Sequence, residues 1–133
     1  RFIQIFGGEQ LRPNIHIKDM VETYLLFLKA DKKLINGEIF NIGSKNMTVK
    51  EIAQIVKQII GEDITFKVVE TNDNRSYHIS SKKILEVLNF ETRYSIGDAV
   101  ADLKDAFEKK LLTNTFENIN YYNIKKMQYI NLK

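Results

Sequence analysis

The chain has 133 residues, of which 44% are hydrophobic and 28% charged, with a formal net charge of +3 and no cysteine. This length suffices for one globular domain, and the absence of cysteine excludes disulfides and thiolate metal sites. Lysines are interspersed with acids, which is typical of a solvated surface rather than a nucleic-acid-binding patch. Apolar runs such as "YLLFL" are too short to span a membrane, so we expect a cytoplasmic protein that binds neither membrane nor nucleic acid.

Alternating β-branched and aromatic residues predict that the chain opens with strands. The segment "FIQIF" predicts a strand at 2–6 that ends at a Gly-Gly turn, and "NIHI" predicts a second strand at 14–17. Asp19 is a good N-cap for a helix at 19–30, whose apolar positions fall on one face. The segment "EIFNIG" predicts a third strand at 38–42.

The second half continues the alternation of helix and strand. Thr48 and Glu51 have the spacing of a capping box, which predicts a helix at 48–60 that ends at Gly61. The remaining predicted elements are a strand at 64–69 and helices at 81–88 and 95–111.

Helices that alternate with strands place the chain in the α/β class. No clear boundary precedes residue 113, so we expect one α/β lobe at 1–112 and a polar Asn/Tyr-rich tail at 113–133. We expect the tail to be extended or poorly ordered, with room for one short helix or strand.

The sequence lacks the common catalytic signatures. It has no G-x-G-x-x-G loop, no Walker loop and no nucleophile elbow. Neither of the two histidines, His16 and His78, has metal-ligand spacing, and we expect no metal site. In this pattern His16 is more typical of a packed strand residue than of a ligand or base, and Asp19 is more typical of a helix cap than of a general base.

The arginines are informative because most basic residues of the chain are lysines. A planar guanidinium can hold a phosphate or carboxylate at two points. Arg12 lies in a turn shaped by glycine and proline, and Arg75 lies in the polar loop "TNDNRSY". Because loops at element ends often hold ligands, both are candidate anion-binding residues, and a surface salt bridge is the alternative for each.

Five segments, in order, resemble the C-terminal half of the extended short-chain dehydrogenase/reductases, which are nucleotide-sugar epimerases, dehydratases and reductases. The family patterns R-x-x-I-H-V-x-D, N-x-G, s-v-x-E-l-a, D-x-R-x-Y and s-l-x-x-g are similar to "RPNIHIKD", "NIG", "TVKEIA", "DNRSY" and "SIGD". The match runs from about Arg12 to Leu112. It departs from the family at "ETNDNR", where many relatives carry R-P-G-x-D, and at "LNFET", where they carry L-G-f-x-P.

This resemblance implies a small substrate-binding lobe that lacks the main Rossmann half of the family. Arg12 would reach the pyrophosphate of a nucleotide-diphosphate (NDP) sugar, Arg75 would lie in a second phosphate-contacting loop, and Asn41 would lie beside the substrate. His16 would lie behind Arg12, and Asp19 would cap the helix that braces the turn.

The family binds its cofactor and carries its catalytic Ser/Thr and Tyr-x-x-x-Lys on the Rossmann half. The resemblance therefore implies NAD or NADP for a full-length parent. It implies no cofactor and no catalytic residue in this chain, which we expect to be inactive alone. Tyr121-x-x-x-Lys125 and Tyr122-x-x-x-Lys126 repeat the spacing in the tail, and we interpret both as chance matches because no cofactor site precedes them.

The segment "QLRPNIHIKDM" is similar to family members that act in cell-surface polysaccharide or lipopolysaccharide synthesis. The expected partners are an NDP-sugar and the missing Rossmann half, with self-association of the exposed apolar surface as a further expectation. The alternative is a stand-alone, non-catalytic module that binds a nucleotide sugar or a protein. The sequence leaves open which sugar and nucleotide are bound, and whether the parent epimerises, dehydrates or reduces.

Overall fold

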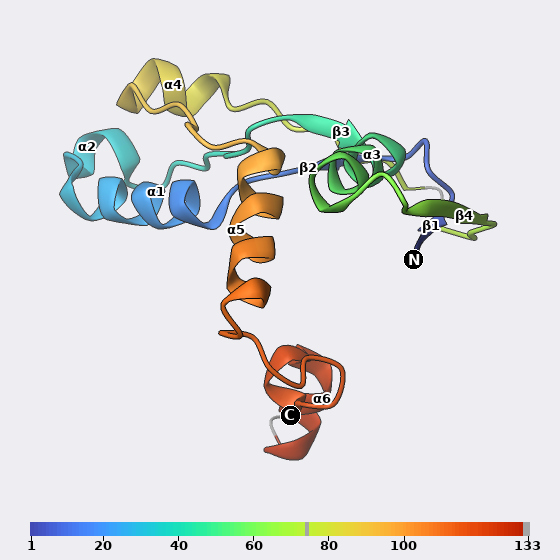
Figure 1. The fold of residues 1–133 in the computed structure, drawn as a ribbon. Helices are drawn as coiled ribbons and strands as arrows, with labels where there is room; N and C mark the ends of the chain where they lie inside the picture. The colour runs from blue at the N-terminus through green and yellow to red at the C-terminus, as the bar shows by residue number, and fades with distance from the viewer. Residues whose placement is uncertain (74, 132–133) are drawn as a thin grey trace. The chain divides into compact units, whose positions relative to one another are not determined.

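The computed structural model describes residues 1–73 and 75–131, which form two compact units, Arg1–Asp102 and Leu103–Lys133. The first unit has a mixed α/β architecture (Figure 1). Its elements are β1 (Phe2–Phe6), β2 (Leu11–Pro13), α1 (Ile17–Lys29), α2 (Lys32–Ile35), β3 (Asn46–Thr48), α3 (Val49–Ile60), β4 (Thr65–Val69) and α4 (Lys82–Leu88). Helix α5 (Ile96–Glu108) begins in the first unit, and the second unit also holds a 3-10 helix (Ile119–Tyr121) and α6 (Asn123–Tyr129).

The strands of the described residues form two separate two-stranded sheets. Strands β1 and β4 run parallel, with Phe2 opposite Thr65. A parallel pair needs a long crossover connection, and the crossover here includes α3, which packs on β1. Strands β2 and β3 are antiparallel, with Arg12 opposite Met47.

Two of the four predicted strands, at 2–6 and 64–69, are confirmed by β1 and β4. The predicted strand at 14–17 is wrong, because β2 ends at Pro13 and α1 already begins at Ile17. The segment 38–42 is extended but is not a strand, since its residues 39–42 form no backbone hydrogen bond within the described part of the chain. The short strand β3, by contrast, was not predicted.

Local capping signals explain why the predicted helices form. In α3, the Glu51 backbone N–H donates to Thr48 Oγ1 at 3.1 Å, and the Thr48 N–H donates to Glu51 Oε2 at 2.7 Å, so the capping box is confirmed. These hydrogen bonds from Thr48 lower the pKa of Glu51. Helix α3 ends at Gly61, as predicted. Helix α1 is capped differently from the prediction, because His16 Nδ1, and not Asp19, accepts the Lys18 N–H at 3.1 Å.

The second unit is more helical than the sequence indicated. Its 3-10 helix begins where Asn118 Oδ1 accepts the Asn120 N–H at 3.0 Å, and α6 follows directly. The functional division of the chain at residue 113 stays a prediction. No helix among the described residues has the length and apolar character that a membrane crossing needs.

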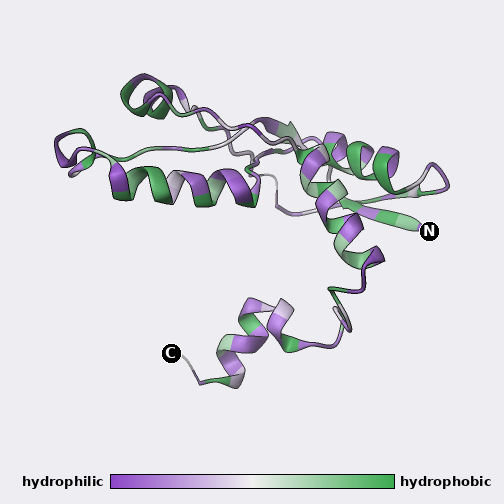
Figure 2. Cartoon of the chain, turned by 60° about the vertical axis from the view of Figure 1, so that its left-hand side comes forward, coloured by the Kyte–Doolittle hydropathy of each residue, from purple (hydrophilic) through white to green (hydrophobic). Residues whose placement is uncertain are grey.

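The core of the first unit is small, and α1 leaves apolar side chains outside it. The buried side chains are Ile5, Ala53, Ile64 and Ile84, together with the polar residues His16, Asp19 and Thr23. Apolar bands recur along the length of α1 in Figure 2. The exposed apolar residues of α1 are Ile17, Val21, Tyr24, Leu25 and Leu28, which recur at helical spacing.

Candidate anion-binding site and adjoining pocket

A loop after β4 is tied to β2 by hydrogen bonds between residues far apart in the sequence. The Tyr77 N–H donates to the Leu11 carbonyl at 3.1 Å, and the Leu11 N–H donates to Ser76 Oγ at 3.0 Å. Arg12 Nη1 donates to the Arg75 carbonyl at 2.6 Å. These contacts bring the two candidate arginines together.

Both guanidinium groups approach one carboxylate, that of Asp73. Arg75 binds it through two hydrogen bonds, from Nε to Oδ1 at 2.7 Å and from Nη2 to Oδ2 at 2.8 Å. Arg12 Nη2 lies 3.8 Å from Asp73 Oδ2, and the Arg12 guanidinium lies 5.5 Å from the ring centre of Tyr77. Hydrogen bonds from the Arg75 side chain, and then from its backbone N–H, lower the pKa of Asp73 to about 2. The site therefore holds one carboxylate anion between two cations at neutral pH.

The two arginines differ in how much of each side chain remains accessible. Arg75 is mostly exposed, whereas the side chain of Arg12 is 29% exposed and also donates from Nη1 to its neighbour Leu11's carbonyl at 3.0 Å. Arg12 thus holds the 73–77 loop in addition to facing Asp73. The guanidinium group of Arg12 is therefore not directed only toward solvent or a ligand.

A pocket of about 240 Å³ lies near the end of β2, because Asn46 in its lining pairs with Pro13. Asn46 connects two chain segments in the wall of the pocket. Its Nδ2 donates to the Ile79 carbonyl at 2.9 Å, and its Oδ1 accepts the Ile79 N–H at 3.0 Å. Ser81 Oγ accepts the Gly43 N–H and donates to the Gly43 carbonyl, both at 2.9 Å. The pocket is lined by residues 42–46, Ile79, Ser81, Lys82, Ile84, Leu85 and 90–92.

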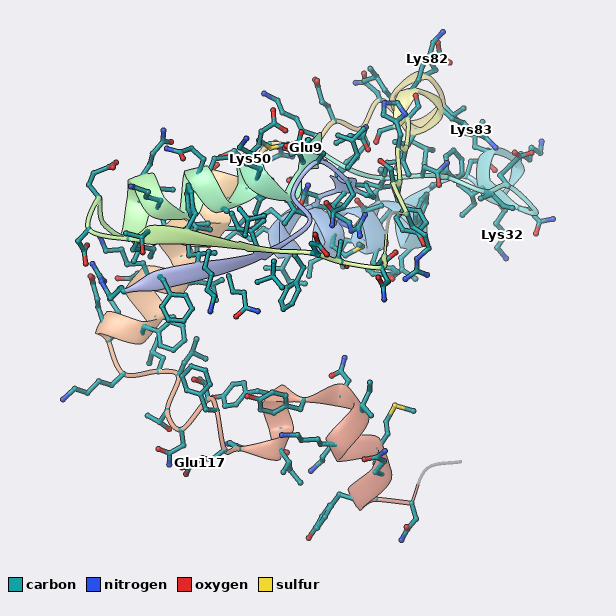
Figure 3. The ribbon with its side chains drawn as sticks, turned by 90° about the vertical axis from the view of Figure 1, so that its right-hand side faces the viewer. Glu9, Lys32, Lys50, Lys82, Lys83 and Glu117 are labelled. Atoms are coloured by element: carbon teal, nitrogen blue, oxygen red, sulfur yellow. The ribbon has the colours of Figure 1, made fainter. Side chains whose placement is uncertain are left out.

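Charged side chains project from the surface of the first unit, and Figure 3 labels several of them. Lys82 and Lys83 extend from α4, and Lys83 Nζ donates to Glu38 Oε2 at 2.6 Å. Near the Gly-Gly turn, Lys50 Nζ lies 3.8 Å from Glu9 Oε1, and the two residues are neighbours in Figure 3.

Asp19 does not cap α1 as expected, because its side chain contacts the segment before α5, and the expected place of His16 behind Arg12 stays a prediction. Asp19 is fully buried, and its two carboxylate oxygens accept the backbone N–H groups of Arg93 at 3.0 Å and Tyr94 at 3.1 Å. The His16 ring stacks on the Tyr94 ring with centres 4.8 Å apart. Because His16 Nδ1 accepts an N–H, neutral His16 carries its proton on Nε2, which lies 3.4 Å from Asp102 Oδ2.

Asn41 is the predicted site residue that the structure does not join to the arginines. Its side chain is exposed, and within the described residues it forms no hydrogen bond or ion pair. Sequence reasoning overlooked Asp73, Tyr77 and Asn46. The pattern D-x-R-x-Y in "DNRSY" holds the first two of these and could have identified them.

The part of the chain that the structure describes contains no cluster of three or more His, Cys, Asp or Glu side chains that could hold a metal ion. In the second unit, Lys125 Nζ lies 4.3 Å from the ring centre of Tyr122, and Lys126 Nζ lies 5.8 Å from that of Tyr129. The Tyr122 hydroxyl donates to the Phe116 carbonyl at 3.2 Å.

Comparisons with known proteins agree on one family. The family model for the NAD-dependent epimerase/dehydratase family matches residues 2–43. UDP-glucuronic acid decarboxylase 6 of Arabidopsis thaliana is 30% identical over 107 residues, covering 78% of this chain and 30% of the relative. CDP-paratose 2-epimerase of Salmonella typhi is 27% identical over 104 residues, covering 74% of this chain and 30% of the relative.

Solved structures of the family have the same fold. UDP-glucose 4-epimerase of Thermotoga maritima, solved with UDP-glucose, is 28% identical, with a TM-score of 0.68 over 84% of this chain and 36% of that one. UDP-glucuronic acid 4-epimerase of Bacillus cereus, solved with UDP-glucuronic acid and NAD, is 22% identical with a TM-score of 0.71, over 83% of this chain and 36% of that one.

The α/β architecture and these relatives match a fragment of the extended short-chain dehydrogenase/reductases. The matching family model and the curated relatives link this chain by similarity to the NAD-dependent epimerase/dehydratase family. The chain spans about 30% of the length of the curated relatives described above.

Proposed function

We propose that this chain is the NDP-sugar-binding portion of an NAD(P)-dependent epimerase, dehydratase or reductase. The observation that carries the proposal is the convergence of Arg12 and Arg75 on one carboxylate, although 63 residues separate them. Paired guanidinium groups suit the two charged phosphates of a nucleoside diphosphate. The pocket lined in part by Asn46 and Ser81 would receive the sugar.

Titration of the isotopically labelled chain with UDP-glucose, followed by NMR, tests this proposal. We expect shifts of the backbone amides at 11–12 and 75–77, and at least a tenfold loss of affinity in Arg12→Ala and in Arg75→Ala, because each removes charge-assisted hydrogen bonds. Arg93→Ala is the matched control, since the Arg93 side chain is 70% exposed and pairs with Glu22 at 3.1 Å. Unchanged amide positions at millimolar UDP-glucose would exclude the proposal.

Arg12 is also tested with a conservative variant, because its hydrogen bonds to the Leu11 and Arg75 carbonyls give it a structural role as well. Arg12→Lys should keep the positive charge but lose the planar fork, so we expect it to restore affinity only in part. A variant of Arg12 that is less stable in urea but binds UDP-glucose as the wild type does would show that Arg12 only holds the loop.

The cofactor and the reaction belong, in this proposal, to a longer parent enzyme. NAD or NADP would bind a Rossmann half that carries the catalytic residues, and this chain alone would be inactive. Saturable NAD(H) binding by the isolated chain, measured calorimetrically at micromolar concentration, would contradict this assignment. We further propose a cytoplasmic role in cell-surface polysaccharide or lipopolysaccharide synthesis, which identification of the sugar product of the parent enzyme would test.

The surface that would receive the Rossmann half is formed by the apolar stripe of α1 and the segment 38–42. The stripe includes Leu28, which is 82% exposed, and Ile39 in the extended segment is 80% exposed. Backbone groups at 39–42 are unpaired within the described residues and could join the edge of a sheet. We assign this surface to the remainder of a family-length enzyme because the curated relatives are about three times as long as the matching region.

Co-expression of this chain with the segment encoded upstream of Arg1 tests that assignment. A glycine-rich dinucleotide-binding loop in that segment and co-purification of the two pieces are expected. Leu28→Glu should reduce the recovered complex, whereas Leu34→Glu, an exposed apolar position on α2, should not. A concentration-dependent dimer of this chain alone that Leu28→Glu abolishes would assign the surface to a second copy instead.

A further inference from the structure

The carboxylate of Asp73 occupies the position between the two arginines where an anionic ligand would bind. Arg75 holds both of its oxygens, at 2.7 and 2.8 Å, and Arg12 approaches one of them at 3.8 Å. Asp73 belongs to the same loop as Arg75, so its effective concentration at the two guanidinium groups is high. A phosphate can therefore reach the Nε–Nη2 edge of Arg75, which lies on the side of Asp73, only after Asp73 leaves it.

We propose that Asp73 is an internal competitor that sets the affinity and selectivity of this site for a nucleoside diphosphate. This inference rests on the proposed function, because it assumes that Arg12 and Arg75 bind phosphate. A ligand with two adjacent charged phosphates can replace Asp73 at both arginines, whereas a singly charged anion exchanges one carboxylate contact for another of similar strength. The competitor thus favours pyrophosphate-bearing ligands over small carboxylates.

The turn that presents Asp73 can persist when its charge is removed. The Asp73 N–H donates to Thr71 Oγ1 at 3.1 Å, and Asp73 Oδ1 accepts the Arg75 N–H at 3.2 Å. An asparagine side chain can accept the same N–H through its amide oxygen, but its NH₂ group cannot accept the second guanidinium hydrogen bond. Asp73→Asn should therefore keep the turn but remove the ion pair and the Nη2 hydrogen bond that hold the guanidinium of Arg75.

A matched control exists at the other end of β4. Asp63, just before β4, is exposed and is held by Arg1 through hydrogen bonds from Nε, at 2.8 Å, and from Nη2. Asp63→Asn removes an arginine–carboxylate pair of the same kind and changes the net charge by the same amount, but it leaves Arg12 and Arg75 untouched.

The experiment measures binding of UDP and of inorganic pyrophosphate to the full 133-residue chain by NMR titration and calorimetry. Asp73→Asn should bind both probes roughly tenfold more tightly than wild type, since it removes both a competing ion pair and a repelling charge. Asp63→Asn should bind as wild type does. Asp73→Asn should discriminate less well than wild type against acetate, a singly charged carboxylate. Should Asp73→Asn fail to fold, Asp73→Ser keeps a short acceptor in the turn and should give the same gain.

The outcomes separate this inference from the proposed function. If wild type binds UDP through the two arginines and Asp73→Asn binds equally well or more weakly, the competitor role is wrong and the proposed function stands. If neither protein binds UDP or pyrophosphate, both are wrong. An equal gain of affinity in Asp63→Asn would reduce the effect to net charge and would also overturn the competitor role.

Discussion

Removal of the Asp19 carboxylate is expected to cause a large loss of stability in the first unit. The side chain is 0% exposed and accepts two backbone N–H groups, from Arg93 at 3.0 Å and from Tyr94 at 3.1 Å. A hydrogen bond to a charged group contributes about 1.5–3 kcal/mol, and loss of the acceptor leaves a buried donor unsatisfied. Asp19→Ala should therefore lower the free energy of unfolding by about 3–5 kcal/mol.

Asp19→Asn measures how much the loss of one of the two hydrogen bonds contributes to stability. The amide keeps one acceptor oxygen but turns an NH₂ group toward the other N–H, so we expect a loss of about 2–3 kcal/mol. Asp31→Ala is the control, because Asp31 accepts one N–H, that of Lys33 at 2.9 Å, on the surface at the start of α2. Its removal should cost about 1 kcal/mol.

Urea unfolding followed by circular dichroism measures the three free energies, and hydrogen exchange measures the local effect. The amides of Arg93 and Tyr94 should lose protection in Asp19→Ala and keep it in Asp31→Ala. A loss below about 1 kcal/mol in Asp19→Ala, with both amides still protected, would refute the reasoning that this carboxylate anchors the segment before α5.

Three further predictions concern local contacts. Thr48→Ala removes one half of the capping box of α3 and should lower stability by about 1 kcal/mol in thermal unfolding, with Thr48→Ser close to wild type. Hydrogen bonds from Thr48 to Glu51 and from Ser95 to Asp98 lower the pKa values of both carboxyl groups. The two carboxylates therefore contribute fully to stability above the ordinary pKa values of 4.5 and 3.8, and this contribution is lost as the pH falls through the lowered pKa values. Melting temperatures that stay constant from pH 6 to about pH 2 would contradict this prediction. A Cβ at Gly43 would lie 2.7 Å from Ile79 Cδ1, so Gly43→Ala should cost about 1–3 kcal/mol and Ile79→Val, which lacks that atom, should recover part of the loss in a double-mutant cycle.

The sequence predicted some residues of the candidate site but not how they come together. The patterns around Arg12 and Arg75 were sufficient to select both residues, because guanidinium groups in loops between elements are typical of anion sites. Their meeting at Asp73 depends on hydrogen bonds between β2 and residues 75–77, more than 60 positions away. Asn41 was selected by its pattern alone and lies apart from these contacts.

Sequence alone determined the elements whose signals are local. The Thr48–Glu51 box and Gly61 set both ends of α3, and the alternation in "FIQIF" gave β1, because each signal acts within a few residues. Tertiary structure decided the rest. Residues 39–42 alternate between exposed and half-buried, as the residues of a strand do, yet a strand exists only where a second backbone supplies hydrogen bonds, and none does so within the described residues. Asp19 has the sequence signature of a helix cap, but its buried oxygens accept the N–H groups of Arg93 and Tyr94, which follow it by 74 and 75 positions. The fold brings these two N–H groups, and not those at the start of its own helix, within hydrogen-bond reach of Asp19.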